Sequence, residues 1–277
     1  MQTVRQIDDL RKALDAFRSE GARLAFVPTM GALHDGHMAL VEAAKRAGTR
    51  VIVSIFVNPI QFGPNEDLAK YPRREQADSR MLTNAGVDLL WMPSAEAMYP
   101  EGFATSVRVS GISDLLDGAH RPGHFDGVAT VVTKLFHQVR PDVALFGEKD
   151  WQQLQVIRRL VADLDMGIEI LGVPTQREDD GLALSSRNAY LMPEDRARAV
   201  ALPRALGAAA KAIAEGGDPE AALAQARDTL TAAGFEVDYV TLADAESLGA
   251  PLEGKPMRLL AAARIGGTRL IDNIPVL

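Results

Sequence analysis

The chain has 277 residues, of which 47% are hydrophobic and 24% are charged, and its formal net charge is −7. These proportions are typical of globular proteins and allow one large domain or two of unequal size. The acidic balance disfavours nucleic-acid binding, because a phosphate backbone is attracted by a basic surface. The lack of cysteine excludes disulfide bonds, thiolate metal sites and a cysteine nucleophile.

Neither a signal peptide nor a membrane span is predicted. The first residues contain no apolar run, and no later stretch approaches the roughly 18 apolar residues that a membrane-spanning helix needs. We therefore expect a soluble, unprocessed protein that does not bind membranes. A cytoplasmic location fits a chain without cysteine.

The first 173 residues alternate between amphipathic stretches and short apolar runs. Apolar residues recur every three or four positions from Val4 to Phe17, which indicates a helix. The run 24–27, which Pro28 stops, indicates a buried strand. The elements expected after it are helix 38–47, strand 51–57, helix 74–85, strand 87–92, helix 127–138, strand 143–146, helix 150–163 and strand 168–173.

This alternation predicts an α/β fold with a Rossmann-like, doubly wound parallel sheet. Beyond Arg187 the pattern changes to alanine-rich helical stretches followed by alternating apolar runs, which predicts a smaller α+β C-terminal domain. We place the boundary within 174–182 and expect domains of residues 1–176 and 177–277. The C-terminal elements expected are helical stretches 194–214 and 218–233 and strands 237–242, 258–265 and 269–274.

Ligands of open α/β sheets bind beyond the carboxyl ends of the strands, so the loops that follow strands are the first candidates for a site. The first loop, residues 28–37, reads PTMGALHDGH. His34 and His37, with Gly36 between them, can approach a phosphate at a helix N-terminus and stabilise charge on a phosphoryl group. A polar turn with a chance pair of histidines and a metal site are the alternatives, although no carboxylate and histidine cluster at ligand spacing joins the pair.

Three further segments carry polar groups suited to a ligand. In 56–62 (FVNPIQF), Pro59 ends the strand and Gln61 presents an amide on a rigid turn, unless this is an ordinary strand-terminating turn. In 147–150, Lys149 is either a phosphate ligand or a solvated lysine, and Asp150 is expected to cap the next helix. The segment 184–187 (LSSR) offers hydroxyls and a guanidinium to phosphate oxygens, or is a flexible surface loop.

These motifs together resemble a known family. HDGH directly after an apolar strand is similar to the HxGH signature of the nucleotidylyltransferase superfamily, whose members attack the α-phosphate of ATP. With PTMGALHDGH, FVNPIQF, GEKDWQQ at 147–153 and LSSRN at 184–188 in this order, the chain resembles the pantothenate synthetase family. The resemblance covers essentially the whole chain and is strongest from about residue 26 to 190.

The resemblance implies an ATP-dependent ligase that condenses (R)-pantoate with β-alanine through a pantoyl adenylate and releases AMP and pyrophosphate. It implies that Gln61 and Gln153 bind pantoate and that Asn58 supports Gln61. Cations and positioned donors should neutralise the charge of an anion attacking a polyanion. The catalytic residues implied are His37, His34, Lys149 and Arg187.

The resemblance also implies an ATP site. Gln176 departs from the aliphatic residue common there in the family, which leaves a backbone contact with adenine. Arg121 and His124 match the family and are placed at the edge of the site, whereas His120 and His137 receive no role. The ATP-binding residues implied are Met30, Gly31, His34, Gly36, His37, Gly147, Glu148, Lys149, Asp150, Gln176, Leu184, Ser185, Ser186 and Arg187.

Further expectations follow from the same resemblance. Mg2+ is expected on the phosphates of ATP, with no dedicated protein ligand. The C-terminal domain is expected to act as a lid that keeps water from the adenylate, and the protein is expected to be a homodimer.

Two other functions fit part of the pattern. A nucleotidylyltransferase that transfers AMP or CMP and stops there also carries HDGH, but it does not need the amide pair Gln61 and Gln153. A non-catalytic ATP sensor is disfavoured by the intact His34, His37 and Lys149.

Overall fold

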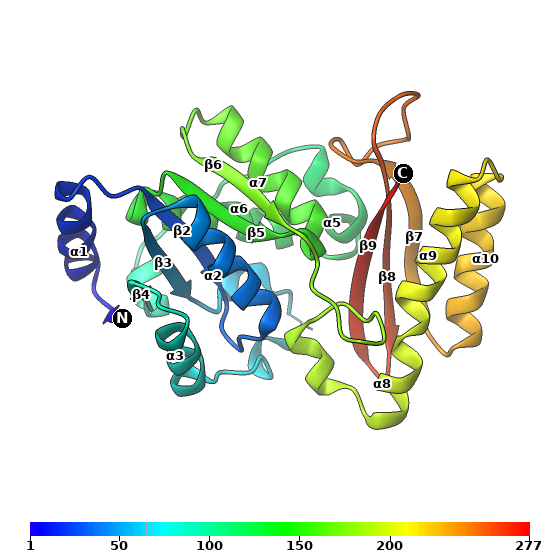
Figure 1. Ribbon diagram of the computed structural model, residues 1–277, viewed down its shortest axis with the longest axis horizontal. Coiled ribbons are helices and arrows are strands. Elements are labelled where there is room, and N and C mark those ends of the chain that lie inside the picture. Colours follow the sequence, from blue (N-terminus) through cyan, green and yellow to red (C-terminus); the bar gives the residue numbers. More distant parts are fainter. Residues whose placement is uncertain (65) are drawn as a thin grey trace.

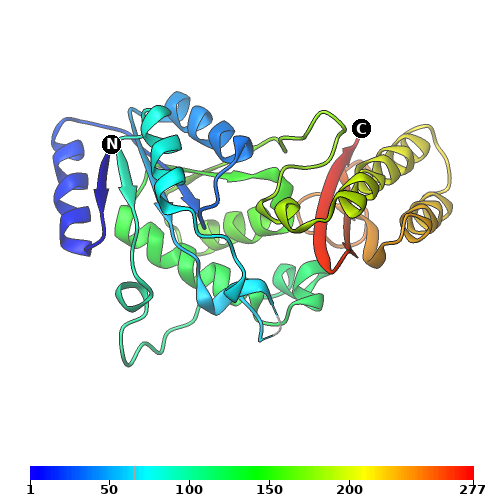
Figure 2. The ribbon, with the colours of Figure 1, turned by 90° about the horizontal axis from the view of Figure 1, so that it is seen from below.

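The computed structural model describes residues 1–64 and 66–277, and these residues form two β-sheets with their helices (Figures 1 and 2). The larger sheet is parallel throughout and has the strand order β1-β4-β3-β2-β5-β6. Its strands are β1 (Gln2–Val4), β2 (Leu24–Thr29), β3 (Arg50–Ile55), β4 (Leu89–Trp91), β5 (Val143–Gly147) and β6 (Glu169–Val173).

Helices cover both faces of the larger sheet, because its strands bury alternate residues on opposite sides. In β2, the fully buried Leu24 and Phe26 belong to one hydrophobic cluster with α1, α6 and α7, and the fully buried Ala25 and Val27 belong to another with α2 and α3. The predicted doubly wound α/β fold is thus confirmed. The helices of this region are α1 (Ile7–Ser19), α2 (Asp35–Ala47), α3 (Glu75–Asn84), α4 (Ala95–Met98), α5 (Leu116–His120), α6 (His124–Val139) and α7 (Trp151–Asp163).

The chain changes direction within the sheet at β2. From β2 it passes to β3 and β4 on one side, and later to β5 and β6 on the other, and β2 pairs directly with β5. At such a switch point the connections from two neighbouring strands run to opposite edges of the sheet, so no other connection covers the loops that follow these strands. The loop after β2 and the turn after β5 therefore lie side by side.

The C-terminal part has its own hydrophobic core and a three-stranded antiparallel sheet in the order β7-β8-β9. The smaller α+β unit expected from the sequence is present (Figure 1), although the helical stretch 194–214 is divided at Val200. The boundary between residues 176 and 177 stays a prediction. The elements are α8 (Pro193–Ala199), α9 (Ala201–Ala214), α10 (Pro219–Ala232), β7 (Glu236–Asp244), β8 (Met257–Ile265) and β9 (Thr268–Val276).

Pro28 lies inside β2 instead of ending it, which corrects the prediction. Thr29 accepts a hydrogen bond from the backbone of Phe56 on the β3 side, so the nitrogen of Pro28 faces β5. The pairing of β2 with β5 covers only residues 25 and 26. The sheet therefore loses no hydrogen bond through the N–H group that Pro28 lacks.

The edge strand β1 was also missed, because Val4 was assigned to the first helix. Three residues are too few to display the alternation that identifies a strand.

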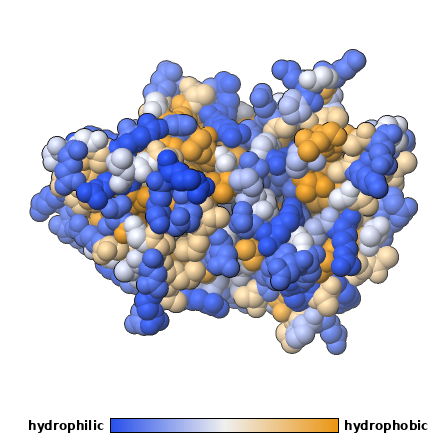
Figure 3. Space-filling model, in the orientation of Figure 1, coloured by the Kyte–Doolittle hydropathy of each residue, from blue (hydrophilic) through white to orange (hydrophobic). Residues whose placement is uncertain are grey.

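On the surface, hydrophobic residues on the face seen in Figure 3 form separate patches among hydrophilic ones. Within residues 1–64 and 66–277, no helix has the length and apolar character needed to cross a bilayer.

Gly127 in α6 allows the helix to touch the turn that carries Gln61. A Cβ atom at this position would lie 2.6 Å from the Cα of Gln61 and 2.6 Å from the carbonyl oxygen of Ile60. We predict that Gly127→Ala destabilises the protein by about 1–3 kcal/mol, because backbone cannot yield as a flexible side chain does. Urea unfolding measures this change.

Gly207 in α9 is the matched control, since a Cβ atom there meets nothing within 4 Å. Gly207→Ala should stabilise the protein by about 0.5–1 kcal/mol through helix propensity alone. Equal stabilisation by both substitutions would contradict the close approach of α6 to Gln61.

Candidate active site

Two cavities meet at the carboxyl ends of the central strands. The smaller, of about 220 Å³, is lined by residues at or just after the ends of β2, β3, β5 and β6. The larger, of about 540 Å³, extends from there to the C-terminal sheet. The residues that line both cavities are Lys149, Asp150, Gln153, Ser185 and Arg187.

Most of the residues singled out in the sequence line the smaller cavity. Among the residues assigned to ATP or pantoate, Gly31 and Glu148 do not: Gly31 is buried beside Asp78 and Ile55, and the side chain of Glu148 points toward the C-terminal sheet. The roles predicted for these residues stay predictions. Those on the lining are Met30, His34, Gly36, His37, Asn58, Gln61, Gly147, Lys149, Asp150, Gln153, Gln176, Leu184, Ser185, Ser186 and Arg187.

The two histidines lie at the N-terminus of α2, which begins at Asp35 and not at residue 38 as predicted: His34 is the N-cap residue and His37 is the third residue of the helix. The Nδ1 atom of His34 accepts a hydrogen bond from the backbone of Gly36 at 3.2 Å, and the Nδ1 atom of His37 accepts one from the backbone of His34 at 3.3 Å. The ring centroids are 4.1 Å apart. Since each Nδ1 atom is an acceptor, the proton of each neutral ring is on Nε2. Both residues thus offer an Nε2–H donor.

Burial keeps both rings uncharged. It lowers the pKa of His37 to about 3, with smaller contributions from His34 and Lys149. The pKa of His34 is also lowered, first by burial and then by Lys149. The site therefore brings two neutral donors and the Lys149 ammonium to one helix N-terminus, which is a suitable arrangement for an anion.

Glycine is required within the histidine turn. A Cβ atom at Gly36 would lie 2.9 Å from Cε1 and 3.0 Å from Nδ1 of His34. Any larger residue would therefore push the imidazole away from the backbone amide that it caps. The glycine of HDGH thus preserves the position of the first histidine.

Asp78 of α3 shapes the loop before the histidines and was missed in the sequence. Its side chain is 2% exposed, and its carboxylate accepts hydrogen bonds from the backbone of Ala32 and of Leu33, both at 2.9 Å. Nothing near Asp78 in the sequence indicates this contact, because the loop lies more than 40 residues away. A buried carboxylate thus fixes the path of the chain from β2 to His34.

An amide pair lies beside an apolar wall of the smaller cavity. Gln61, in the 3-10 turn η1 (Pro59–Gln61), is 8% exposed, and its Oε1 atom accepts a hydrogen bond at 3.0 Å from Nδ2 of Asn58. The contact expected between these two residues is therefore present. Gln153 of α7 lines the same cavity. The apolar residues on the lining include Phe56, Val128, Val131, Val132 and Leu135.

The C-terminal sheet holds the turn that carries Lys149. The Nδ2 atom of Asn273 in β9 donates to the carbonyl oxygens of Glu148 and Lys149, at 2.9 and 2.8 Å. Arg258 of β8 pairs with the Glu148 carboxylate at 3.3 Å and stacks on the ring of Trp151, 3.4 Å from its centroid. The turn η4 (Glu148–Asp150) is thus anchored by residues more than 100 positions away.

Asp150 does not cap α7, contrary to the prediction. It occupies the position before the helix, but its side chain makes no capping hydrogen bond. Its carboxylate lies 3.9 Å from Nζ of Lys149 and is about half exposed. Since both residues line both cavities, the charged pair faces the space where the cavities meet.

The serine and arginine segment contacts the loop after β2 and also the segment after η1. Ser186, in η5 (Ser186–Tyr190), donates to the carbonyl oxygen of Ala32 at 3.1 Å. Arg187 forms a bidentate ion pair with Asp67 at 2.9 and 3.0 Å and lies 5.8 Å from the ring centroid of Tyr71. The guanidinium of Arg187 is therefore occupied by the Asp67 carboxylate, which a phosphate group can replace because it offers similar oxygen acceptors.

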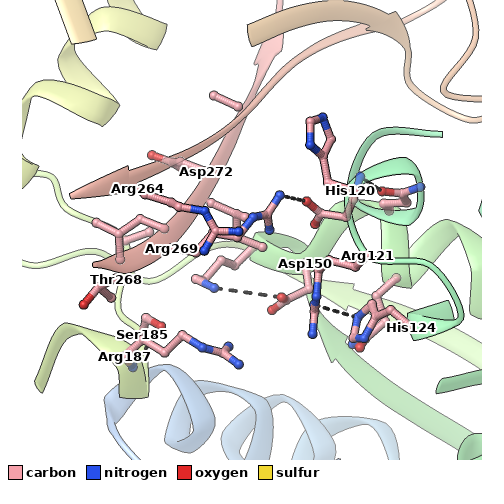
Figure 4. A pocket seen from close by; sticks show the side chains of 18 of the residues that line it. His120, Arg121, His124, Asp150, Ser185, Arg187, Arg264, Thr268, Arg269 and Asp272 are labelled. Atoms are coloured by element: carbon pink, nitrogen blue, oxygen red, sulfur yellow. Dashed lines mark hydrogen bonds and ion pairs between the residues drawn. The ribbon is translucent and has the colours of Figure 1, made fainter. Parts of the chain in front are cut away.

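Arg121 and His124 lie at the edge of the larger cavity, as Figure 4 shows. Arg121 forms a bidentate pair with Glu66 at 2.8 and 2.6 Å, and its Nη1 atom donates to Nε2 of His124 at 3.0 Å. Burial lowers the pKa of His124 to about 4. Arg264 and Arg269 approach the same cavity from the C-terminal sheet (Figure 4).

Metal ligands do not cluster in the part of the chain that the structure describes. No group of three or more histidine, cysteine, aspartate or glutamate side chains is placed to hold an ion there. His34 and His37 use their Nδ1 atoms on backbone amides, which fits donors to an anion better than a shared metal site.

Comparison with known proteins gives one family. The model of the family described as pantoate-beta-alanine ligase matches residues 2–275. The chain is 66% identical to pantothenate synthetase of Rhizorhabdus wittichii, with 100% of this chain and 99% of the relative covered. For the protein of the same name from Sphingopyxis alaskensis, the identity is 59% and both chains are fully covered.

Solved structures agree. The chain is similar to pantothenate synthetase from Thermus thermophilus, with a TM-score of 0.94, 50% identity, and coverage of 100% of this chain and 99% of the other. It is also similar to a pantoate-beta-alanine ligase from Francisella tularensis complexed with beta-gamma ATP and beta-alanine. There the TM-score is 0.84 at 35% identity, with 99% and 97% of the two chains covered.

We predict that His34 and His37 remain neutral Nε2–H tautomers in the free protein at neutral pH, and that His37 does so down to about pH 4, one unit above its pKa. Two-dimensional NMR of 15N-labelled imidazoles reads the protonated nitrogen of each ring directly. Gln substitutions of each residue assign the signals. An Nδ1–H tautomer, or protonation of His37 near pH 6.5, would contradict the hydrogen bonds of the turn.

The lowered pKa also sets the sign of the pH dependence of stability. The pKa of His37 is 6.5 in the unfolded chain and about 3 in the folded protein. Between these pH values, His37 is protonated in the unfolded chain but not in the folded protein. Stability is therefore lost as the pH falls between these values, by up to about 1.4 kcal/mol per pH unit. Urea unfolding of wild type should show this loss between pH 6.5 and 5, and His37→Gln should show correspondingly less.

Proposed function

Because the chain belongs to the pantoate–β-alanine ligase family, we propose that it condenses pantoate with β-alanine after activating the pantoate carboxylate as an adenylate. The observation that carries the proposal is the meeting of phosphate-binding and amide groups in one cavity. His34, His37 and Lys149 line it together with Gln61 and Gln153.

In the first half-reaction, a carboxylate oxygen of pantoate attacks the α-phosphorus of ATP. The new O–P bond forms as the bond from the α-phosphorus to the bridging oxygen breaks, and pyrophosphate leaves. Negative charge is present on both reactants, so alignment and neutralisation supply most of the catalysis. In our proposal the Lys149 ammonium and the two Nε2–H donors provide this neutralisation.

Neutral histidines suit this role in the free protein. An Nε2–H group donates to a phosphate oxygen without first losing a proton, and the bound polyanion raises the pKa of a neighbouring imidazole. His37 thus begins as a hydrogen-bond donor and becomes a stronger one as charge develops. Arg187 joins the phosphates by leaving Asp67, since its guanidinium binds phosphate and carboxylate through the same fork.

Pantoate fits the polar and apolar parts of the smaller cavity. Its hydroxyl and carboxylate groups require hydrogen-bond partners, which Gln61 and Gln153 supply, and its dimethyl-substituted carbon requires an apolar wall, which Val128, Val131 and Val132 supply. The cavity of about 220 Å³ is smaller than the 300–1,000 Å³ typical of drug-sized ligands. In our proposal ATP lies along Gln176 and Leu184, on the lining of this cavity, and extends beyond it.

In the second half-reaction, the uncharged amine of β-alanine attacks the acyl carbon of the adenylate. The C–N bond forms, the C–O bond to AMP breaks, and the proton of the amine passes to solvent or buffer. The larger cavity meets the smaller one at Lys149 and Asp150, so it gives the amine a route to the acyl carbon.

Three features of the proposal rest on the family resemblance. Mg2+ accompanies ATP on its phosphates, the protein works as a cytoplasmic homodimer, and the C-terminal unit closes over the adenylate. Closure is supported by the position of β9 beside the turn of Lys149, where Asn273 already contacts two carbonyl oxygens.

The direct test is release of AMP and pyrophosphate from Mg–ATP with pantoate, with and without β-alanine. We expect AMP release that depends on both pantoate and β-alanine and that yields an amide. Lys149→Gln should reduce kcat by about 100-fold to 1,000-fold, the usual effect of losing one group that stabilises developing charge. The exposed Lys45→Gln on α2 is the control and should leave kcat unchanged.

Two outcomes would contradict the proposal. AMP transfer to pantoate without amide formation would indicate a nucleotidylyltransferase. Nucleotide binding without turnover, in wild type as in Lys149→Gln, would indicate an ATP sensor.

A further inference from the structure

A chain of hydrogen bonds leads from the smaller cavity to a tyrosine outside it. The hydroxyl of Tyr99, the residue after α4, lies 2.7 Å from Oδ1 of Asn58, and Nδ2 of Asn58 lies 3.0 Å from Oε1 of Gln61. Tyr99 lines neither cavity. It is separated from Asn58 by 41 residues and belongs to no motif in the sequence.

The direction of every bond in this chain is determined. The Nδ2 atom of Asn58 also lies 3.1 Å from the carbonyl oxygen of Gly127, which can only accept. The amide of Asn58 is therefore oriented with its oxygen toward Tyr99, whose hydroxyl must donate. Burial raises the pKa of Tyr99, so its proton is retained.

The orientation of the Asn58 amide also determines the orientation of the Gln61 side-chain amide. The second N–H of Asn58 donates to the Gln61 amide, so the atom facing Asn58 is the oxygen. The Nε2 atom of Gln61 then faces Met30, with its sulfur at 3.3 Å, on the cavity side. Sulfur is a weak acceptor, so an N–H of Gln61 remains available to a ligand.

The surroundings leave this arrangement little freedom. Asn58 is 1% exposed, and the backbone carbonyl of Gln61 accepts a hydrogen bond from Nδ1 of His124 at 2.8 Å. The ring of Tyr99 packs against Phe56 and Phe103, with centroids 6.1 and 5.0 Å away. The hydroxyl of Tyr99 is thereby aimed at a single buried acceptor.

We propose that Tyr99 is a positioning residue: its hydroxyl holds Asn58 in the orientation that the Gly127 carbonyl selects, and so keeps the side-chain amide of Gln61 as a hydrogen-bond donor toward an acceptor oxygen of the carboxylic acid substrate. A glutamine amide without this support can rotate by half a turn and present its carbonyl oxygen, which repels a carboxylate or hydroxyl oxygen. Tyr99 thus favours an acceptor in this position through Asn58, without touching the substrate. The inference rests on the proposed role of Gln61 in binding pantoate.

Tyr99→Phe tests the inference, because it removes the hydroxyl and keeps the ring. We expect the KM for pantoate to rise about tenfold, which corresponds to about 1.4 kcal/mol. The KM for ATP and the kcat at saturating pantoate should remain within about twofold of wild type, since an interaction lost equally from ground and transition states changes KM alone.

Thr130→Val is the matched control for simple loss of a buried hydrogen bond. Thr130 lies in α6, three residues from Gly127, is 3% exposed, and accepts a hydrogen bond from the backbone of Val107 at 2.9 Å. It lines neither cavity. Thr130→Val should lower the midpoint of thermal unfolding, as Tyr99→Phe does, but it should leave the KM for pantoate unchanged.

A double-mutant cycle with Gln61→Ala separates positioning from a general structural effect. If Tyr99 acts through Gln61, Tyr99→Phe should raise the KM for pantoate in the wild-type background and have no further effect in Gln61→Ala. An unchanged KM in Tyr99→Phe, or the same increase in both backgrounds, would overturn the inference.

The cycle also distinguishes this inference from the proposed function. If Gln61→Ala alone leaves the KM for pantoate unchanged, the role of Gln61 in the proposed function fails, and the inference about Tyr99 fails with it. If Gln61→Ala raises this KM and Tyr99→Phe does not, the proposed function stands and only the inference is wrong.

Discussion

The parallel pairing of β2 with β5 is the constraint on which the site depends. The chain leaves β2 toward one edge of the sheet and β5 toward the other, so the loop of His34 and the turn of Lys149 lie side by side without competing for space. The burial of Phe26 and Ala144 on opposite strands of this pair holds the register. Displacement of either strand would separate the histidine donors from the lysine.

Around this pair lie neutral hydrogen-bond donors, which in our proposal stabilise the charge of the reacting groups. The two imidazoles are partly buried, and each uses Nδ1 on a backbone amide, so that Nε2–H remains for a ligand. A ligase that joins two anions during adenylation gains from donors of this kind, since they need no reorganisation when charge develops. The C-terminal sheet contributes through Asn273, so the turn of Lys149, in the middle of the chain, is held by a strand near its C-terminal end.

The sequence predicted features that depend on local pattern. The alternation of strands and helices was sufficient for the doubly wound sheet, and strand ends indicated the loops of His34, Gln61 and Lys149. Contacts between distant segments could not be predicted: Asp78 supports the loop before His34, and Tyr99 reaches Asn58 across 41 residues. Local rules also failed where tertiary structure decides, as with Asp150, which faces Lys149 and leaves α7 without a side-chain cap.

The central claim is that the pantoate carboxylate attacks the α-phosphorus of ATP. Pantoate labelled with 18O in its carboxylate, incubated with Mg–ATP, β-alanine and the protein, tests it directly by mass spectrometry of the products. An acyl adenylate requires one labelled oxygen per molecule to appear in AMP when the C–O bond breaks. Label in inorganic phosphate, accompanied by ADP, would instead show attack on the γ-phosphorus and contradict the account.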